Sequence, residues 1–247
     1  MVIRTWNLFH GNTIPPGRRA YLREMIELVT ADRPDVVCVQ EVPGWALGRL
    51  GEWAGMTEAP AAARRPSLGP LPIPHALGRA LTAPNHGLIR SAFAGQGNAL
   101  LVSPELTLVS ASSTRIDDRA PRREPRVAQH VELRLQDGRR LTVVNLHASN
   151  SPDPAVCDAE LGRALAGTDE DAIVVLAGDL NVKPERSQMI RSLVPAFSSP
   201  LSDSIDQILV RGAAVTSLRA WDADDRRFGG KLLSDHAVVE ATLRMSE

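Results

Sequence analysis

Six short polar motifs stand at the ends of apolar, strand-like runs, and they contain the residue types of a hydrolytic or metal-binding site. They are Thr5-Trp6-Asn7, Gln40-Glu41, Asn145-Leu146-His147, Gly178-Asp179-Leu180-Asn181, Asp206 and Ser234-Asp235-His236. A polar residue that directly follows an apolar strand emerges at the rim of a sheet, where several strand ends can meet at one pocket. We therefore expect these side chains to form one site.

Each motif taken alone also has a purely local explanation, such as a turn asparagine, a capping aspartate or a core histidine. Together, Glu41, Asp179 and Asp235 would gather three carboxylates, which is costly unless a hard cation neutralises them. Carboxylate and amide oxygens suit Mg²⁺ or Mn²⁺, and the lack of a Cys/His cluster disfavours structural zinc. Two histidines beside such a cation would supply acid/base groups for phosphoester hydrolysis.

The elements that must position these motifs are spread along the whole chain. Strand-like runs occupy residues 2–9, 36–39, 98–102, 127–135, 141–146, 173–177, 205–210 and 237–243. Helical patterns fall between them, at residues 18–31, 154–165 and 185–193. No repeat or flexible linker divides the chain, so we predict a single domain over residues 1–247, an α/β sandwich built on two sheets.

Residues 59–94 are the exception, because proline is frequent there and no clear strand pattern is present. We interpret them as a long surface excursion with one helix near residues 75–81. Long loops in compact domains often carry function, and this one is expected to border a substrate cleft.

Composition narrows the class of protein. Of the 247 residues, 43% are hydrophobic and 23% charged, as in ordinary globular proteins, and the net charge of −1 argues against coating nucleic acid by bulk electrostatics. No apolar run approaches the ~20 residues of a membrane span, and no signal-peptide pattern opens the chain.

The two cysteines form no disulfide framework, and Cys38 stands in an apolar run. We expect a monomer in the cytoplasm.

The order Trp-Asn, Gln-Glu, Asn-x-His, Gly-Asp-x-Asn, Asp and Ser-Asp-His resembles the endonuclease/exonuclease/phosphatase superfamily, from Asn7 to His236. This superfamily includes pancreatic deoxyribonuclease and exonuclease III. The resemblance implies a four-layer αββα sandwich, with two mixed β-sheets flanked by helices and the active site at one rim. It also implies a phosphoesterase that depends on Mg²⁺ or Mn²⁺.

The resemblance also implies roles for individual residues. Glu41 would be the principal metal ligand, with Asn7 and Asp235 beside it. The catalytic set would be His147, Asp179, Asn181, Asp206 and His236. Asp179 would orient the attacking water and Asn181 the phosphate. His236, oriented by Asp206, would face the scissile phosphate, and His147 would assist the leaving oxygen.

Finer likenesses extend this set. Arg123-Glu124-Pro125 is similar to a motif of pancreatic-type deoxyribonucleases, which implies that Arg123 clamps a phosphate. Asn150 matches an asparagine of abasic-site endonucleases and exonuclease III, which implies a second substrate-binding residue. Gln96 stands where pancreatic-type enzymes pair a glutamate with the histidine equivalent to His147. A glutamine can orient the imidazole but cannot stabilise its charged form as a carboxylate does.

Three functions follow from these observations. The first is a nuclease, an endonuclease or exonuclease with nucleic acid as its substrate, and the arginines between residues 115 and 126 fit either a phosphate-tracking edge or a solvated loop. The second is a phosphatase or phosphodiesterase acting on a small-molecule or lipid headgroup phosphate, which the near-neutral charge favours slightly. The third, a non-catalytic binding domain, is disfavoured because Glu41, Asp179, Asn181 and His236 are all present.

Overall fold

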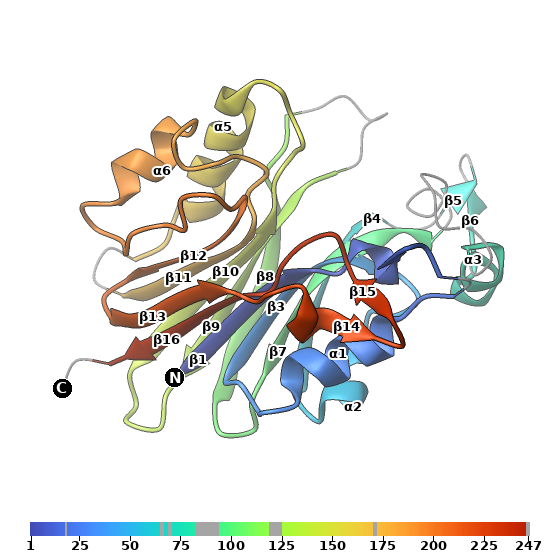
Figure 1. Cartoon of the computed structure of the whole chain (residues 1–247). Coiled ribbons are helices and arrows are strands. Elements are labelled where there is room, and N and C mark those ends of the chain that lie inside the picture. Colours follow the sequence, from blue (N-terminus) through green and yellow to red (C-terminus); the bar gives the residue numbers. More distant parts are fainter. Residues whose placement is uncertain are drawn as a thin grey trace.

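The computed structural model describes residues 1–17, 19–64, 67–68, 71–82, 94–118, 125–169 and 172–245, and two β-sheets stack face to face in it (Figure 1). The first has the strand order β13 (Ala214–Ala220), β16 (Val239–Arg244), β1 (Val2–Asn7), β3 (Val36–Pro43), β7 (Gln96–Val102) and β4 (Thr57–Arg64). The second has the order β12 (Asp206–Arg211), β11 (Ile173–Asp179), β10 (Arg140–His147), β9 (Val127–Arg134) and β8 (Thr107–Arg115). Each combines one parallel pair with antiparallel neighbours, so both sheets are mixed.

Helices cover the outer faces of the two sheets (Figure 1). The helices are α1 (Leu22–Thr30), α2 (Leu50–Ala54), α3 (His75–Thr82), α5 (Pro154–Leu165) and α6 (Gln188–Leu193). Shorter elements are β2 (Thr13–Ile14), β14 (Arg227–Phe228), β15 (Lys231–Leu233), β5 (Ser67–Leu68), β6 (Leu71–Pro72) and two 3₁₀ turns, η1 (Phe9–Gly11) and η2 (Asp224–Arg226). In the described part of the chain, no helix has the length and apolar character needed to cross a membrane.

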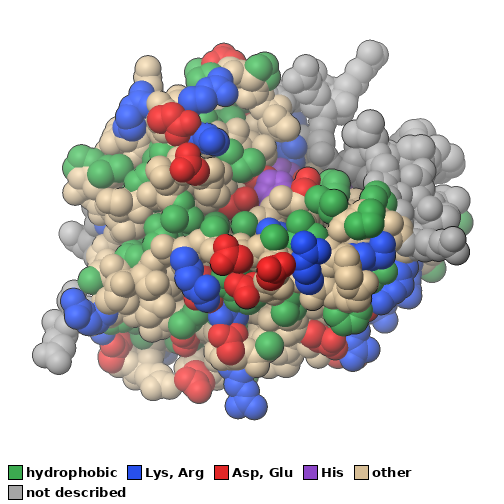
Figure 2. All heavy atoms as spheres, in the orientation of Figure 1, with side chains coloured by type: hydrophobic (Ala, Val, Ile, Leu, Met, Phe, Trp, Pro, Cys, Tyr) green, Lys and Arg blue, Asp and Glu red, His purple; other side chains and the backbone are tan. Residues whose placement is uncertain are grey.

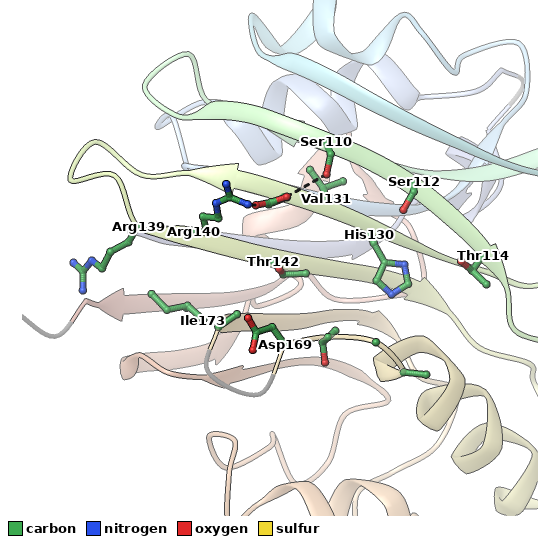
Figure 3. Close-up of a pocket in the computed structure, with 15 residues that line it drawn as sticks. Ser110, Ser112, Thr114, His130, Val131, Arg139, Arg140, Thr142, Asp169 and Ile173 are labelled. Carbon is green, nitrogen blue, oxygen red and sulfur yellow. Dashed lines mark hydrogen bonds and ion pairs between the residues drawn. The ribbon is translucent and has the colours of Figure 1, made fainter.

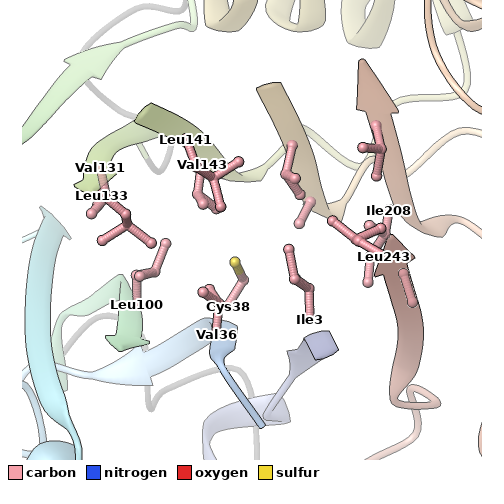
Figure 4. Packing of buried hydrophobic residues seen from close by; sticks show 14 of the residues in the cluster. Ile3, Val36, Cys38, Leu100, Val131, Leu133, Leu141, Val143, Ile208 and Leu243 are labelled. Atoms are coloured by element: carbon pink, nitrogen blue, oxygen red, sulfur yellow. The ribbon is translucent and has the colours of Figure 1, made fainter. Parts of the chain in front are cut away.

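Three apolar clusters define the layers. The cluster between the sheets includes Ile3, Cys38 and Val143, all fully buried (Figure 4). A second cluster joins the first sheet to α1 and α2, and a third joins the second sheet to α5 and α6. Alternate residues of a strand face opposite sides, so β3 contributes Cys38 to the first cluster and Val37 to the second. The α/β fold and its αββα layering, expected from the family resemblance, are confirmed.

The two parallel pairs place the motif-bearing strand ends at the same rim. β1 runs parallel to β3, with Asn7 opposite Gln40, and β10 runs parallel to β11, with His147 opposite Asp179. β12 is antiparallel to β11 and therefore begins at this rim, with Asp206 opposite Asp179. The carboxyl ends of β1, β3, β10 and β11 thus lie beside the start of β12.

The predicted surface excursion is partly wrong. The segment from residue 57 forms β4, which pairs with β7 and buries Ala59 and Ala61. An edge strand tolerates proline because one of its backbone edges has no partner strand. Pro60 therefore fits within β4, although in the sequence it obscured the strand pattern. The helix expected near residues 75–81 is present as α3. The edge strands β8 and β13 were not predicted, because most of their side chains are exposed on both faces and give no alternation.

Candidate active site

Acidic, amide and imidazole side chains from both sheets meet at this rim. The predicted residues brought together are Asn7, Glu41, His147, Asp179, Asp206 and His236. Asp179 lies at the centre, and its Oδ2 is 3.5 Å from Nε2 of His147 and 3.8 Å from Nε2 of His236. Asp179, Asp206 and His147 are buried, whereas Glu41 and His236 keep part of their side chains exposed. The cluster therefore has a closed floor and an open mouth.

Glu41 reaches the rim because β3 is irregular there. The pairing of β3 with β7 shifts register between Val39 and Val42, and Glu41 has a φ of 54°. A bulge of this kind redirects the side chains that follow it. As a result Val42, and not Glu41, joins Val37 and Val39 in the apolar cluster beneath α1. The glutamate is left to face the site.

Asn7 holds the two carboxylates nearest to it. Its Nδ2 donates to Oε1 of Glu41 over 3.3 Å and to Oδ2 of Asp179 over 3.0 Å, while its Oδ1 accepts the backbone N–H of Phe9 over 2.9 Å. In this orientation the amide positions carboxylates and does not offer its own oxygen to a cation. Direct metal ligation by Asn7 would use the second lone pair of Oδ1, beside its bond with Phe9.

The Gly-Asp-x-Asn motif has a steric basis. Gly178 has a φ of 143°, and a Cβ there would lie 1.9 Å from the carbonyl oxygen of Leu146, so only glycine permits this approach of β11 to β10. Asp179 follows directly and accepts the backbone N–H of Asn181 on Oδ1 over 3.0 Å. Asn181, with a φ of 52°, anchors its own side chain by donating to the carbonyl of Ala148 over 2.9 Å.

His236 is fixed from three directions. Its Nδ1 lies 2.9 Å from Oδ2 and 3.1 Å from Oδ1 of Asp206. Its backbone N–H donates to the hydroxyl of Ser234, which itself donates to the carbonyl of Asn7 over 2.7 Å. Its carbonyl accepts the indole N–H of Trp6 over 3.0 Å. The imidazole therefore presents Nε2 to the site with little freedom to rotate.

Burial and neighbouring charges shift the pKa values of Asp179, Asp206 and His236. Burial and the negative charge of Asp206 raise the pKa of Asp179 to about 7. Burial likewise raises the pKa of Asp206 above its usual range, despite its hydrogen bond with His236. Although burial lowers the pKa of His236, the hydrogen bond to Asp206 and the surrounding carboxylates outweigh it and raise that pKa to about 9. At neutral pH the proton of the His236–Asp206 pair therefore resides on His236.

His147 differs from His236 in the charge beside its Nδ1. That nitrogen lies next to the Arg126 guanidinium, whereas Nδ1 of His236 lies next to the Asp206 carboxylate. A terminal nitrogen of Arg126 lies 3.1 Å from its Nδ1, and Nε2 faces Glu41 at 3.8 Å. Burial, reinforced by the Arg126 charge, holds the pKa of His147 well below its usual range. Gln96, expected beside this ring, is buried opposite Pro43 at the start of β7, and the described contacts of the ring do not include it.

Two residues at the site were missed from the sequence. Arg126 was counted only in a run of arginines, and His10 was not considered. His10 lies in the 3₁₀ turn after β1, and its Nε2 is 3.2 Å from Oε2 of Glu41. Its position three residues after Asn7 was the available signal, but only the turn with φ of 53° at His10 brings it back to the rim.

The remaining predicted residues lie at the margin of the site or outside the described part of the chain. Asp235 is exposed, and its Oδ1 is 4.0 Å from Nε2 of His236. Asn150 is exposed in the segment after β10. Arg123, the predicted phosphate clamp, lies outside the described residues.

A metal ion has one evident set of ligands among the described residues. Asp179, Asp206 and His236 each offer a ligand atom, and these atoms lie within 4.8 Å of one another. Glu41 stands on the other side of Asp179, held by Asn7, and offers a more exposed carboxylate. This rim can therefore hold a divalent cation either among the Asp–Asp–His group or beside Glu41.

The site opens into a hollow of the surface. Figure 2 shows histidine and acidic side chains side by side in a depression between the layer of α5 and α6 and the segment of β14 and β15. A separate cavity of about 730 Å³ lies on the outer face of β8, β9 and β10 (Figure 3). It is lined by Arg140 and Ile173, which begin β10 and β11, so it sits toward the opposite rim. The cluster of acidic and imidazole side chains at the rim is not part of that cavity.

Comparison with known proteins decides the family. The model of the Endonuclease/Exonuclease/phosphatase family matches residues 5–236. The chain belongs to this family. As a member, it is a phosphoesterase with a possible Asp179–Asp206–His236 metal site, and its substrate is a phosphoester.

Solved structures of family members and related proteins have the same fold. A functionally unknown conserved protein from Enterococcus faecalis V583 is 15% identical with a TM-score of 0.75, and the alignment covers 100% of both chains. A family member from Beutenbergia cavernae is 16% identical with a TM-score of 0.71, covering 99% of this chain and 71% of that one. TDP2 from Caenorhabditis elegans is 16% identical with a TM-score of 0.65, covering 98% and 74%. No curated protein sequence matches the chain.

Proposed function

We propose that this phosphoesterase is a nuclease, which hydrolyses phosphodiester bonds of nucleic acid with the help of Mg²⁺ or Mn²⁺. The observation that supports the proposal best is the convergence of Glu41, Asp179 and Asp206 with two imidazoles at one rim. The buried carboxylates of Asp179 and Asp206 repel each other, as the raised pKa of Asp179 reflects, and the more exposed Glu41 adds a third negative charge at this rim, so a cation bound there would offset the repulsion.

The residues present fit a hard divalent cation, because the donors are carboxylates and no cysteine is among them. Glu41 would hold it as the principal ligand, with Asp235 as a further oxygen donor and Asn7 orienting Glu41. Mg²⁺ or Mn²⁺ bound there would supply charge neutralisation to the phosphate. This assignment leaves Asp206 engaged with His236 through both of its oxygens.

The protein's own residues account for the other requirements of an in-line displacement. Asp179, which faces both imidazoles, orients the attacking water, and Asn181 holds a phosphate oxygen. His236, kept protonated by Asp206, donates to the phosphate as negative charge develops on it. His147 is neutral, and its Nε2–H assists at the oxygen that departs.

A substrate panel tests the proposal. Plasmid, single-stranded DNA, RNA and bis-p-nitrophenyl phosphate represent diesters, whereas p-nitrophenyl phosphate, inositol phosphates and sphingomyelin represent the alternative small-molecule and headgroup substrates. Each is assayed with Mg²⁺, with Mn²⁺ and in EDTA. We expect cation-dependent cleavage of the nucleic acids and of the model diester. Cleavage of only the phosphomonoesters or only the lipid would replace the nuclease by the alternative function.

Matched variants separate the site from general effects. Glu41→Gln should lose most of the diesterase activity. Glu105→Gln, an exposed glutamate in the turn after β7 at the opposite rim, should keep it. Equal activity of the two variants would contradict the proposed site.

A further inference from the structure

A second pocket opens beside the catalytic cluster. It has a volume of about 410 Å³ and includes His10, the same residue whose Nε2 lies 3.2 Å from Glu41. The rest of its lining comes from the first turn of α1 and the residues just before it, from the end of β3 and the segment that follows it, and from α2 and α3. The residues that define its chemistry are Glu24, Trp45, Arg49, Trp53 and Arg79. Because His10 belongs to both, a substrate at the catalytic rim can extend directly into this pocket.

Aromatic surface is concentrated in this pocket. The chain has only 4 tryptophans, and Trp45 and Trp53 both line it while remaining half-buried. The guanidinium of Arg79 lies 5.3 Å from the centroid of the Trp45 ring, so a planar cation already stacks against that indole. Indole and guanidinium planes together are the surfaces on which nucleobases stack.

The pocket also offers one buried hydrogen-bond acceptor. Glu24 accepts a bond from Arg19 on Oε1, whereas its Oε2 is buried and has no hydrogen-bond partner among the described residues. A buried acceptor gains most from a ligand that brings an N–H group to it. Nucleobases present such groups on their edges.

Cations at the mouth complete the arrangement. Arg49 is exposed at the pocket and has no ion-pair partner among the described residues, and Arg79 lies beside it in the lining. Exposed guanidinium groups beside a stacking surface suit the phosphates that flank a base.

We propose that this pocket takes an unpaired nucleobase next to the scissile phosphodiester, so that the preferred substrate is single-stranded nucleic acid. The inference rests on the proposed function. A base within a duplex is stacked on both faces and paired along its edge, and it can reach neither the Trp45 ring nor the Glu24 carboxylate without being extruded. A single strand meets no such barrier.

Binding in EDTA tests the proposal independently of catalysis. A labelled single-stranded oligonucleotide and its duplex are titrated with the full-length protein, and fluorescence anisotropy reports the complex. We expect the single strand to bind at least about 10-fold more tightly than the duplex. Trp45→Ala should weaken single-strand binding by about 10-fold, as loss of one stacking partner does, and Trp45→Phe should restore most of it.

Arginine variants provide a second test that does not disturb the apolar cluster. Arg49→Ala should weaken single-strand binding several-fold and reduce its salt dependence. Arg244→Ala is the matched control, because this exposed arginine ends β16 at the opposite rim and should change neither. Equal effects of the two arginine variants, or preference for the duplex, would overturn the proposal.

Hydrolysis of bis-p-nitrophenyl phosphate separates the two proposals, because this small diester carries no nucleobase to fill the pocket. We expect Trp45→Ala and Arg49→Ala to cleave it like the wild type while cleaving the single strand several-fold more slowly. If the wild type cleaves both substrates and neither variant differs from it, the pocket proposal fails and the nuclease stands. If the wild type binds the single strand through Trp45 but cleaves no diester, the nuclease fails and the pocket stands.

Discussion

The Nδ1 atom of His147 lies 3.1 Å from a terminal nitrogen of the Arg126 guanidinium. A guanidinium only donates hydrogen bonds, so this contact favours Nδ1 as the acceptor and Nε2 as the site of the ring proton, although the same Arg126 nitrogen also lies 3.5 Å from Nε2. That nitrogen faces Oδ2 of Asp179 at 3.5 Å. Arg126 therefore favours a neutral imidazole whose N–H points toward the carboxylates, and it lies outside the six motifs recognised in the sequence.

Replacing Arg126 should release His147 from this tautomer. In Arg126→Met the hydrogen bond and the nearby positive charge are lost, so the pKa of His147 should rise, while burial keeps it below the ordinary value of about 6.5. Histidine ring ¹⁵N shifts, followed against pH in EDTA, measure both the tautomer and the pKa. Arg134→Met is the control, because Arg134 is exposed at the end of β9, at the opposite rim. An unchanged His147 titration in Arg126→Met would contradict the assignment.

The His236–Asp206 pair should make stability depend on alkaline pH. The folded-state pKa of His236 is raised to about 9, above an unfolded value of about 6.5. A raised histidine pKa gives stability that is fully present below the unfolded value and is lost as pH rises through the folded value. The free energy of unfolding should therefore fall from about pH 6.5 to about pH 9 and change little above that range.

Urea denaturation in EDTA across that range measures the effect. In Asp206→Asn the nearest negative charge is gone and only a neutral acceptor remains for Nδ1, so the pKa of His236 should drop and the fall in stability should be smaller. Asp203→Asn, a change at an exposed aspartate in the turn before β12, should retain the wild-type dependence. A steeper fall in Asp206→Asn than in the wild type would refute the pairing.

Asn145 connects the two sheets directly below the site. Its Oδ1 accepts from Gln40 over 2.8 Å, and its Nδ2 donates to the carbonyl of Ala99 over 3.0 Å and to Oε1 of Gln129 over 3.2 Å. Asn145→Leu would leave these buried groups without a partner and should cost about 2–4 kcal/mol of unfolding free energy. Thr142→Val, on the same strand but half-buried, should cost less than about 1 kcal/mol. Urea denaturation at neutral pH compares the two.

The strands that carry the site could be predicted because their apolar runs end abruptly in polar residues. β10 and β11 each bury almost every residue and then present His147 and Asp179 at the rim. β8 and β13 could not be recognised in the same way, since an exposed edge strand has no apolar face to reveal its period.

The side-chain contacts of the site were less predictable than its strands. The bulge in β3 gives no pattern in Gln40-Glu41-Val42, yet it decides that Glu41 and not Val42 faces the site. Arg126 and His10 lie in segments whose course depends on tertiary packing, so only the structure brings them to His147 and Glu41. The family resemblance suggested that Gln96 pairs with His147, whereas among the described residues Arg126 contacts that ring.

The last prediction concerns where the cation binds. If Glu41 is the principal ligand, Glu41→Gln should weaken Mn²⁺ binding by at least about 10-fold, because a neutral amide replaces the carboxylate while Asn7 and His10 still surround it. Asp179→Asn should bind Mn²⁺ nearly as well as the wild type but lose most of its turnover of bis-p-nitrophenyl phosphate, since the water-orienting carboxylate is gone. Isothermal titration calorimetry and steady-state kinetics provide the two measurements. The Asp179–Asp206–His236 group predicts the opposite order, because Asp179 is one of its ligands and Glu41 is not. Loss of Mn²⁺ binding in Asp179→Asn with retention in Glu41→Gln would therefore move the cation to that group.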